Sequence, residues 1–185
     1  MGLLKSGINE VIATTAFNAA PIGIHVRDGS TTMLLFSGTH TVENVVRDGW
    51  VVANLIHDPL LYVKTAFDDL PRDAFVEEPV AGKPMYRLAD AEAWVAFTAH
   101  VEKNTSGTIR VGLTREKEII ESVAVHPVNR GFSNLIDATV HATRYRENRD
   151  PELKKLIDYH TGIVRKCGGK KEFEALDLLM QYIGE

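Results

Sequence analysis

The first two thirds of the chain carry apolar residues in runs and alternations that have the period of β-strands. In the run 92–102, Trp94 and Ala96 alternate with Val95 and Phe97, so that the two sets face opposite sides of a sheet. Asp28-Gly29, between two such runs, is typical of a tight hairpin turn. The runs that predict strands are 8–17, 19–26, 33–36, 50–56, 92–102 and 108–125.

From residue 129 onward the apolar residues recur with a period of about 3.6, which predicts helices. These helices cover 133–147, a segment that begins at Asp150-Pro151, and 170–183, with Gly168-Gly169 between the last two. The middle helix has an apolar stripe that we expect to pack on the strands. The stripe consists of Leu153, Leu156, Ile157, Ile163 and Val164.

Strands followed by helices predict an α+β fold, in which a β-barrel or sheet carries a C-terminal helical unit. We expect the barrel domain to cover residues 1–126 and the helical unit 127–185. Within the first part, Asp58-Pro59 predicts the start of a short helix. Residues 71–90 contain three prolines and predict a long irregular loop.

A turn rich in hydroxyl groups follows the strand 33–36. Ser37-Gly38-Thr39-His40 breaks that strand, and Thr41 is the expected N-cap of a helix over 42–48 that ends at Gly49. Free backbone N–H groups and the positive end of the helix dipole make this turn a candidate anion site, most naturally for a phosphate. A capped helix start that binds nothing is the alternative.

The strand 19–26 contains Ala20-Pro21-Ile22-Gly23, which is unusual for the centre of a sheet. One interpretation is a kink at the edge of a barrel. The other is a flat backbone ledge against which a planar ring lies. The local sequence favours neither.

Composition and motifs argue against several classes of function. The net charge of −4, from 21 basic and 25 acidic residues, argues against a nucleic-acid binder. The sequence shows no signal peptide and no apolar run of membrane-spanning length, so we expect a cytoplasmic protein without a membrane partner. The seven histidines are scattered without ligand spacing, and no metal is expected. Nucleotide-binding and hydrolase motifs are absent. A cofactor that brings its own chemistry fits this pattern.

Three motifs in order resemble an uncharacterised family of FMN-binding proteins, the domain of unknown function 447. They are Ala20-Pro21-Ile22-Gly23, then the segment from Phe36 through Thr41 to Asn44, then Val51-Val52-Ala53-Asn54. Segments 128–132 and 140–144 resemble the helical part of the same family. The resemblance covers roughly residues 6–147.

The resemblance implies a Greek-key antiparallel split barrel of the flavin reductase type, which dimerises with FMN at the subunit interface. FMN phosphate is then expected on the turn 37–41, and the isoalloxazine ring along 20–23. An FMN-dependent oxidoreductase or flavin reductase of unknown substrate is the implied function, and a non-catalytic flavin sensor, carrier or assembly partner is the alternative. The residues implied to bind or support the cofactor are Ala20, Pro21, Ile22, Gly23, Phe36, Ser37, Gly38, Thr39, His40, Thr41, Asn44, Asn54 and Arg130.

Overall fold

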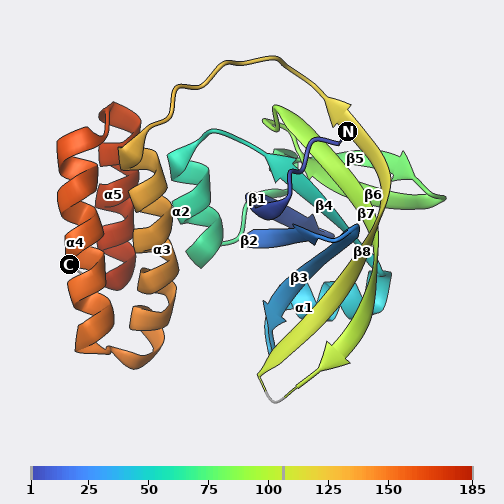
Figure 1. The fold of residues 1–185 in the computed structure, drawn as a ribbon, viewed down its shortest axis with the longest axis horizontal. Coiled ribbons are helices and arrows are strands. Elements are labelled where there is room, and N and C mark those ends of the chain that lie inside the picture. The colour runs from blue at the N-terminus through green and yellow to red at the C-terminus, as the bar shows by residue number, and fades with distance from the viewer. Residues whose placement is uncertain (1, 106, 185) are drawn as a thin grey trace. The chain divides into compact units, whose positions relative to one another are not determined.

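A computed structural model describes residues 2–105 and 107–184 of the 185-residue chain. The chain separates into two compact units, Met1–Ile56 with Leu70–Ala124, and His57–Asp69 with Val125–Glu185. The first is a β-barrel and the second is helical (Figure 1). The division differs from the expected boundary between residues 126 and 127, because the helical unit also takes in 57–69.

The barrel is antiparallel and closed, with the strand order β1-β2-β3-β8-β7-β4. The neighbours β4-β1-β2-β3 have the Greek-key order. This confirms the expected α+β fold with an antiparallel barrel. Its strands are β1 (Gly7–Thr15), β2 (Asn18–Arg27), β3 (Ser30–Phe36), β4 (Trp50–Leu55), β7 (Ala93–Asn104) and β8 (Thr108–Ile120).

Alternation along the strands separates the inside of the barrel from the outside. In β7, Val95 and Phe97 belong to the barrel core, while Trp94 and Ala96 belong to a second cluster. The hairpin between β2 and β3 turns at Asp28 and Gly29, whose φ angles of 51° and 76° are both left-handed. Two such residues in succession are the requirement of a type I′ turn, as the Asp-Gly pair predicts.

A hairpin covers the outer face of β4 and β7. The expected irregular loop over 71–90 is wrong, because the segment forms a short 3-10 turn (η1, Arg72–Ala74) followed by paired strands β5 (Phe75–Val80) and β6 (Lys83–Leu88). Pro79 lies opposite Pro84 at the tip. A two-stranded hairpin has free edges, so prolines cost it few ladder hydrogen bonds. Met85 and Val80 bury against Trp50 and Trp94.

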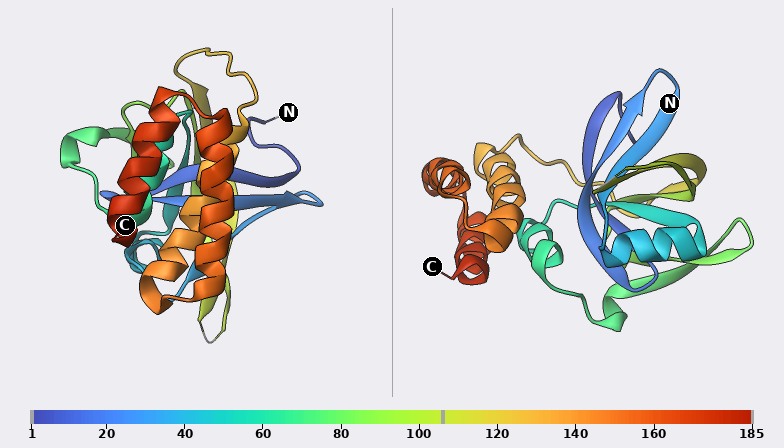
Figure 2. Two further views of the ribbon diagram at one scale, coloured as in Figure 1. Left: turned by 90° about the vertical axis from the view of Figure 1, so that its left-hand side faces the viewer. Right: turned by 90° about the horizontal axis from the view of Figure 1, so that it is seen from below.

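The helix α1 (His40–Asp48) follows β3 and lies against the barrel (Figure 2). Its Val42 and Val45 belong to the barrel core. Its N-cap is Thr39, whose hydroxyl accepts from the Val42 N–H at 3.4 Å, so the expectation that Thr41 caps the helix is wrong. Gly49 ends α1 with a φ of 68°, as expected.

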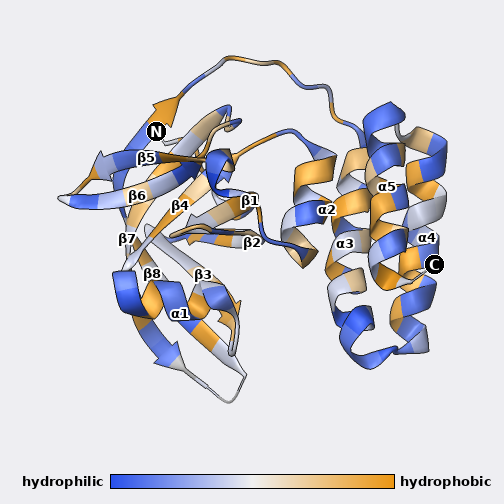
Figure 3. Ribbon diagram, turned by 180° about the vertical axis from the view of Figure 1, so that it is seen from behind, coloured by the Kyte–Doolittle hydropathy of each residue, from blue (hydrophilic) through white to orange (hydrophobic). Residues whose placement is uncertain are grey.

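The described residues of the second unit form four helices, and in Figure 3 the hydropathy colours mark α2 as largely apolar. Asp58 caps α2 as predicted. Val63 packs with Leu135, Ile157 and Leu176 in a core shared by all four helices. These helices are α2 (Pro59–Phe67), α3 (Arg130–Asn148), α4 (Pro151–Cys167) and α5 (Lys170–Ile183).

Two expectations for this unit need correction. Helix α3 begins three residues earlier than 133, because the Asn129 side chain accepts from the Gly131 N–H at 2.8 Å and caps it. In the stripe of α4, Ile157 and Val164 are fully buried, but Leu156 is 42% exposed. The buried members pack against other helices of the same unit rather than on strands. Over the described residues, no helix is both long and apolar enough to cross a membrane.

Candidate functional site

The first half of β2 extends beyond its pairing with β3. The two strands pair from Ile24 with Met33 to Arg27 with Ser30, whereas β1 pairs with β2 from Gly7 through Thr15. Residues 18–23 therefore pair with β1 along one edge of the strand, and β3 does not pair with their other edge. Pro21, which has no N–H, lies in this half, where one side of the strand needs no ladder donor.

Gly23 has a packing reason of its own. A Cβ at this position would lie 2.9 Å from Cγ2 of Ile8 on the neighbouring strand. A larger residue would have to displace the Ile8 side chain, so the packing of β1 on β2 is itself a reason for glycine at this position. The open edge of β2 remains a place where a planar ligand can meet backbone groups.

The turn between β3 and α1 is exposed and rich in hydrogen-bond donors. Gly38 has a φ of 83°, in the left-handed region. The Ser37 N–H donates to the Gly107 carbonyl at 3.1 Å, and the Thr39 hydroxyl lies 3.1 Å from the Phe36 carbonyl. Helix geometry leaves the N–H groups of His40 and Thr41 without intrahelical acceptors.

Two asparagines fix the start of α1 to the β1–β2 hairpin. The Asn18 side-chain amide donates to the Thr41 hydroxyl at 2.9 Å. The Asn44 amide donates to the Thr15 carbonyl at 3.0 Å. The donor-rich turn is thus held beside the beginning of β2. Asn44, expected as a contact or a support for a cofactor, acts here as a support.

Asn54 is also a support, and the structure does not favour it as a cofactor contact. The residue is fully buried, and its amide donates to the Ile12 carbonyl at 2.8 Å and the Thr14 hydroxyl at 3.1 Å. Its carbonyl oxygen accepts from the Leu88 N–H at 2.8 Å. One side chain therefore ties β4 to β1 and to the β5–β6 hairpin.

The other expected site residues fall into two groups. Arg130 is the first residue of α3 and is exposed in the helical unit. The rest lie in the barrel unit, on the β2 half-strand or in the turn and helix start. These are Ala20, Pro21, Ile22, Gly23, Phe36, Ser37, Gly38, Thr39, His40 and Thr41.

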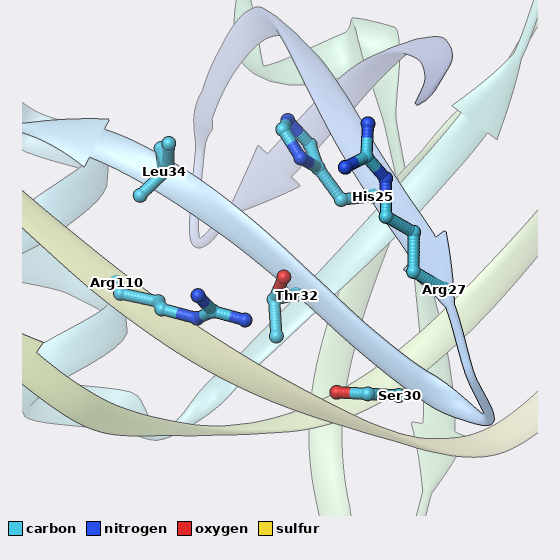
Figure 4. Close-up of a pocket in the computed structure, with 6 residues that line it drawn as sticks. All are labelled: His25, Arg27, Ser30, Thr32, Leu34 and Arg110. Carbon is cyan, nitrogen blue, oxygen red and sulfur yellow. The ribbon is translucent and has the colours of Figure 1, made fainter. Parts of the chain in front are cut away.

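A second candidate site, missed from the sequence, is a basic depression on the outer face of β2, β3 and β8 (Figure 4). Five of its members lie within residues 25–34 of the β2–β3 hairpin, and the pairing of β3 with β8 adds Arg110. The sequence holds no run of lysines or arginines around these positions that would have indicated a cationic site. The depression is lined by His25, Arg27, Ser30, Thr32, Leu34 and Arg110.

Clearly shifted pKa values occur away from both candidate sites. A hydrogen bond from Arg47 lowers the pKa of Asp48 at the end of α1. Burial, together with a hydrogen bond to Asp68, raises the pKa of Tyr182 to about 12. Burial and the neighbouring His160 lower the pKa of His141. Among the described residues, no group of three His, Cys, Asp or Glu side chains is arranged to hold a metal ion.

Sequence and structure comparisons place the chain among known proteins. A protein from Methanocaldococcus jannaschii, described as uncharacterized protein MJ1453, is 24% identical over 94% of this chain and 97% of its own length. The crystal structure of the FMN-bound protein MM1853 from Methanosarcina mazei superposes with a TM-score of 0.91. It is 34% identical and the match covers 96% of both chains.

The family models cover nearly the whole chain. The N-terminal model of the protein of unknown function DUF447 matches residues 9–122, which contain the barrel strands except for the first two residues of β1. The C-terminal model of the same family matches residues 129–181, which contain α3, α4 and most of α5. The chain belongs to the DUF447 family, as its sequence motifs predict.

Proposed function

We propose that this protein binds FMN in its barrel unit and acts as an FMN-dependent oxidoreductase. The observation that carries the proposal is the likeness to MM1853, which is described as FMN-bound and shares 34% identity over 96% of both chains. At this identity and coverage, the residues around a bound cofactor are expected to correspond. The barrel of this chain offers hydrogen-bond donors at the turn 37–41.

The FMN phosphate is assigned to the turn 37–41. A phosphate needs several donors directed at one point, and the turn offers the free N–H groups of His40 and Thr41. Ser37 adds a hydroxyl group, whereas the Thr39 hydroxyl already donates to the Phe36 carbonyl, and Gly38 has the left-handed φ that allows the backbone to fold around an anion. His40 is the first residue of α1 and supplies an exposed imidazole at the same place.

The isoalloxazine ring is assigned to the open half of β2. Residues 18–23 start beside the turn, because the Asn18 amide bonds to Thr41. Phe36 at the end of β3 is 60% exposed and adds an apolar surface of the kind that flavin rings contact. This chain would bind and orient the cofactor, and FMN would supply the electron transfer.

A homodimer is part of the proposal. Leu34 and Phe36 are 53% and 60% exposed on the outer face of β3. Together with the open edge of β2, they leave an apolar surface that a second copy would cover. Sedimentation of the FMN-saturated protein at micromolar concentration tests this, since a monomer under those conditions contradicts the dimer.

The first experiment is the visible absorption spectrum of the purified protein, followed by calorimetric titration with FMN and riboflavin. FMN should bind more tightly by roughly tenfold, because riboflavin lacks the phosphate that the helix start recognises. Failure to bind either flavin would contradict the proposal. Steady-state assays with NADH and NADPH then test turnover. Flavin binding with no turnover from either donor would favour the non-catalytic carrier.

A further inference from the structure

A row of side chains crosses the outer face of four barrel strands. His25 pairs with Thr32, Thr32 with Gly112, and Gly112 with His100. Directly paired residues point to the same face of a sheet. On β3 this face is the outer one, because the adjacent Met33 is fully buried in the barrel core.

The middle of this row consists of small residues, so the surface is hollowed there. A Cβ on Gly112 would lie 2.5 Å from the His100 ring and 2.5 Å from Oε1 of Glu102, so a larger residue would push these two side chains aside. Thr32, beside it, is short and only 7% exposed. The surrounding side chains are longer and form the walls of the basic depression.

The walls of this depression are cationic. Arg27 and His25 come from β2 on one side of β3, and Arg110 comes from β8 on the other, with its guanidinium directed towards Thr32 (Figure 4). Arg110 Nε lies 3.1 Å from Glu102 Oε2, so one of the two arginines already holds a carboxylate. In the described part of the chain, no carboxylate lies within 4.0 Å of the Arg27 guanidinium.

We propose that this depression binds the phosphate group of a small phosphorylated ligand, at a position separate from the turn that we assign to FMN. Two guanidinium groups on opposite sides match the several acceptor oxygens of a phosphate, because each presents a planar fork of donors. The Thr32 hydroxyl lies between the two arginines, and Ser30 adds a second hydroxyl to the lining (Figure 4). Leu34 also lines the depression, on the side where the surface assigned to the second copy begins.

The depression and the turn 37–41 are two separate places on the surface. Thr32 and Phe36 lie on the same face of β3, four residues apart, which is about 13 Å along an extended strand. This exceeds the size of one phosphate group several-fold. The depression and the turn can therefore be occupied at the same time, and binding at the depression does not depend on the flavin.

The test is calorimetric titration of the full-length protein with inorganic pyrophosphate, both without FMN and with FMN at saturation. With FMN at saturation, one pyrophosphate per chain should bind, because FMN then occupies the turn 37–41; without FMN, the turn can take a second one. Parallel titrations with ADP and glucose 6-phosphate distinguish a nucleotide from a sugar phosphate as the source of the group. No binding of any of the three to the FMN-saturated protein would overturn the proposal.

Variants make the assignment specific. Arg27→Gln and Arg110→Gln should each weaken pyrophosphate binding by about tenfold or more, since each removes a charge-assisted pair. Arg115→Gln is the matched control, because Arg115 is an exposed arginine on the same strand β8 and pairs with Glu118. Equal weakening in Arg115→Gln would show a non-specific charge effect and would refute the site.

Glu102→Gln should have the opposite effect on pyrophosphate affinity. Removing the carboxylate that Arg110 holds frees that guanidinium for the ligand, so pyrophosphate should bind several-fold more tightly. Unchanged or weaker binding in Glu102→Gln would contradict the role of Arg110. FMN affinity should be unchanged in all four variants. If FMN fails to bind the wild-type protein while pyrophosphate binds, the flavin proposal fails and this one stands.

Discussion

The side-chain amide of Asn18 donates a hydrogen bond to the hydroxyl of Thr41 at 2.9 Å, and this contact joins the β1–β2 turn to the first turn of α1. Thr41 is only 5% exposed. Its hydroxyl is therefore used inside the protein, and the group that caps the helix is that of Thr39. The two threonines have different tasks, although they are two residues apart.

Thr41→Val should lower the free energy of unfolding by about 1 kcal/mol, because it removes an acceptor while keeping the side-chain volume. FMN affinity should fall modestly, since the start of α1 is then less firmly held. Chemical denaturation and calorimetry measure the two effects. Thr114→Val, an exposed threonine on β8, is the control and should change neither. Wild-type stability in Thr41→Val would show that the Asn18 contact contributes nothing.

Substitutions at Thr39 separate capping from phosphate binding. Thr39→Asp keeps a good N-cap but places a negative charge where the phosphate is proposed to lie, so the protein should fold normally and bind FMN much more weakly. Riboflavin binding should change far less. Thr39→Ala should cost about 1 kcal/mol of stability through the lost cap. Normal FMN affinity in Thr39→Asp would place the phosphate elsewhere.

Asn54→Ala should lower the stability of the barrel by roughly 2–4 kcal/mol, because it leaves buried partners on β1 and β6 without their hydrogen bonds. FMN affinity per folded molecule should be unchanged, because Asn54 is a support. Thermal unfolding followed by calorimetry on the folded fraction tests both statements. A large loss of affinity in folded protein would make Asn54 a contact.

Two neighbouring residues of α4 should respond very differently to truncation. Ile157 is fully buried among the helices, so Ile157→Ala should cost roughly 2–5 kcal/mol. Leu156 is 42% exposed, and Leu156→Ala should cost much less. Urea unfolding followed by circular dichroism measures the difference. Equal losses would mean that Leu156 is covered in solution.

The stability of the helical unit should fall as the pH drops below about 6.5. Burial and the nearby His160 lower the pKa of His141, with Asp137 opposing and Arg144 adding to the shift. As the pH falls below about 6.5, His141 becomes protonated in the unfolded chain but stays neutral in the folded chain, so acid favours unfolding. Urea midpoints at pH 7.5 and pH 5 measure the slope.

His141→Leu should flatten this slope and raise the stability at pH 5. The Nδ1 atom of His141 is buried without a hydrogen-bond partner among the described residues, so its removal leaves no other group unpaired. His40→Gln, at an exposed position, is the control. An unchanged slope in His141→Leu would exclude His141 as its cause.

Local patterns in the sequence predicted most of the strands and helices, because alternation, caps and turn residues act over short distances. Asp28-Gly29, Asp58 and Gly49 are found in their expected roles. The β5–β6 hairpin was missed because Pro79 and Pro84 argue against strands. Only their position opposite each other at the tip of a two-stranded sheet makes them acceptable.

The candidate site was predictable in part. The turn after β3 could be found because its donors are consecutive, but the choice between Thr39 and Thr41 as the cap depends on where α1 begins. Asn54 was expected near a ligand, yet its partners on β1 and β6 are distant in sequence and use its whole amide. The basic depression requires β8 beside β3, which no local pattern indicates.

The path of the chain through the two units has a consequence for its synthesis. The chain leaves the barrel after Ile56, forms α2, and returns at Leu70 before β5–β8 are made. On the ribosome, α2 therefore emerges well before α3 and α5, which supply the apolar partners of Val63. Until the last segment is released, the apolar face of α2 stays exposed beside the nascent barrel. Exposed apolar surface of this kind is what chaperones bind. A fragment that stops at the end of β8 would keep that state permanently, so the barrel and the helices are expected to mature together.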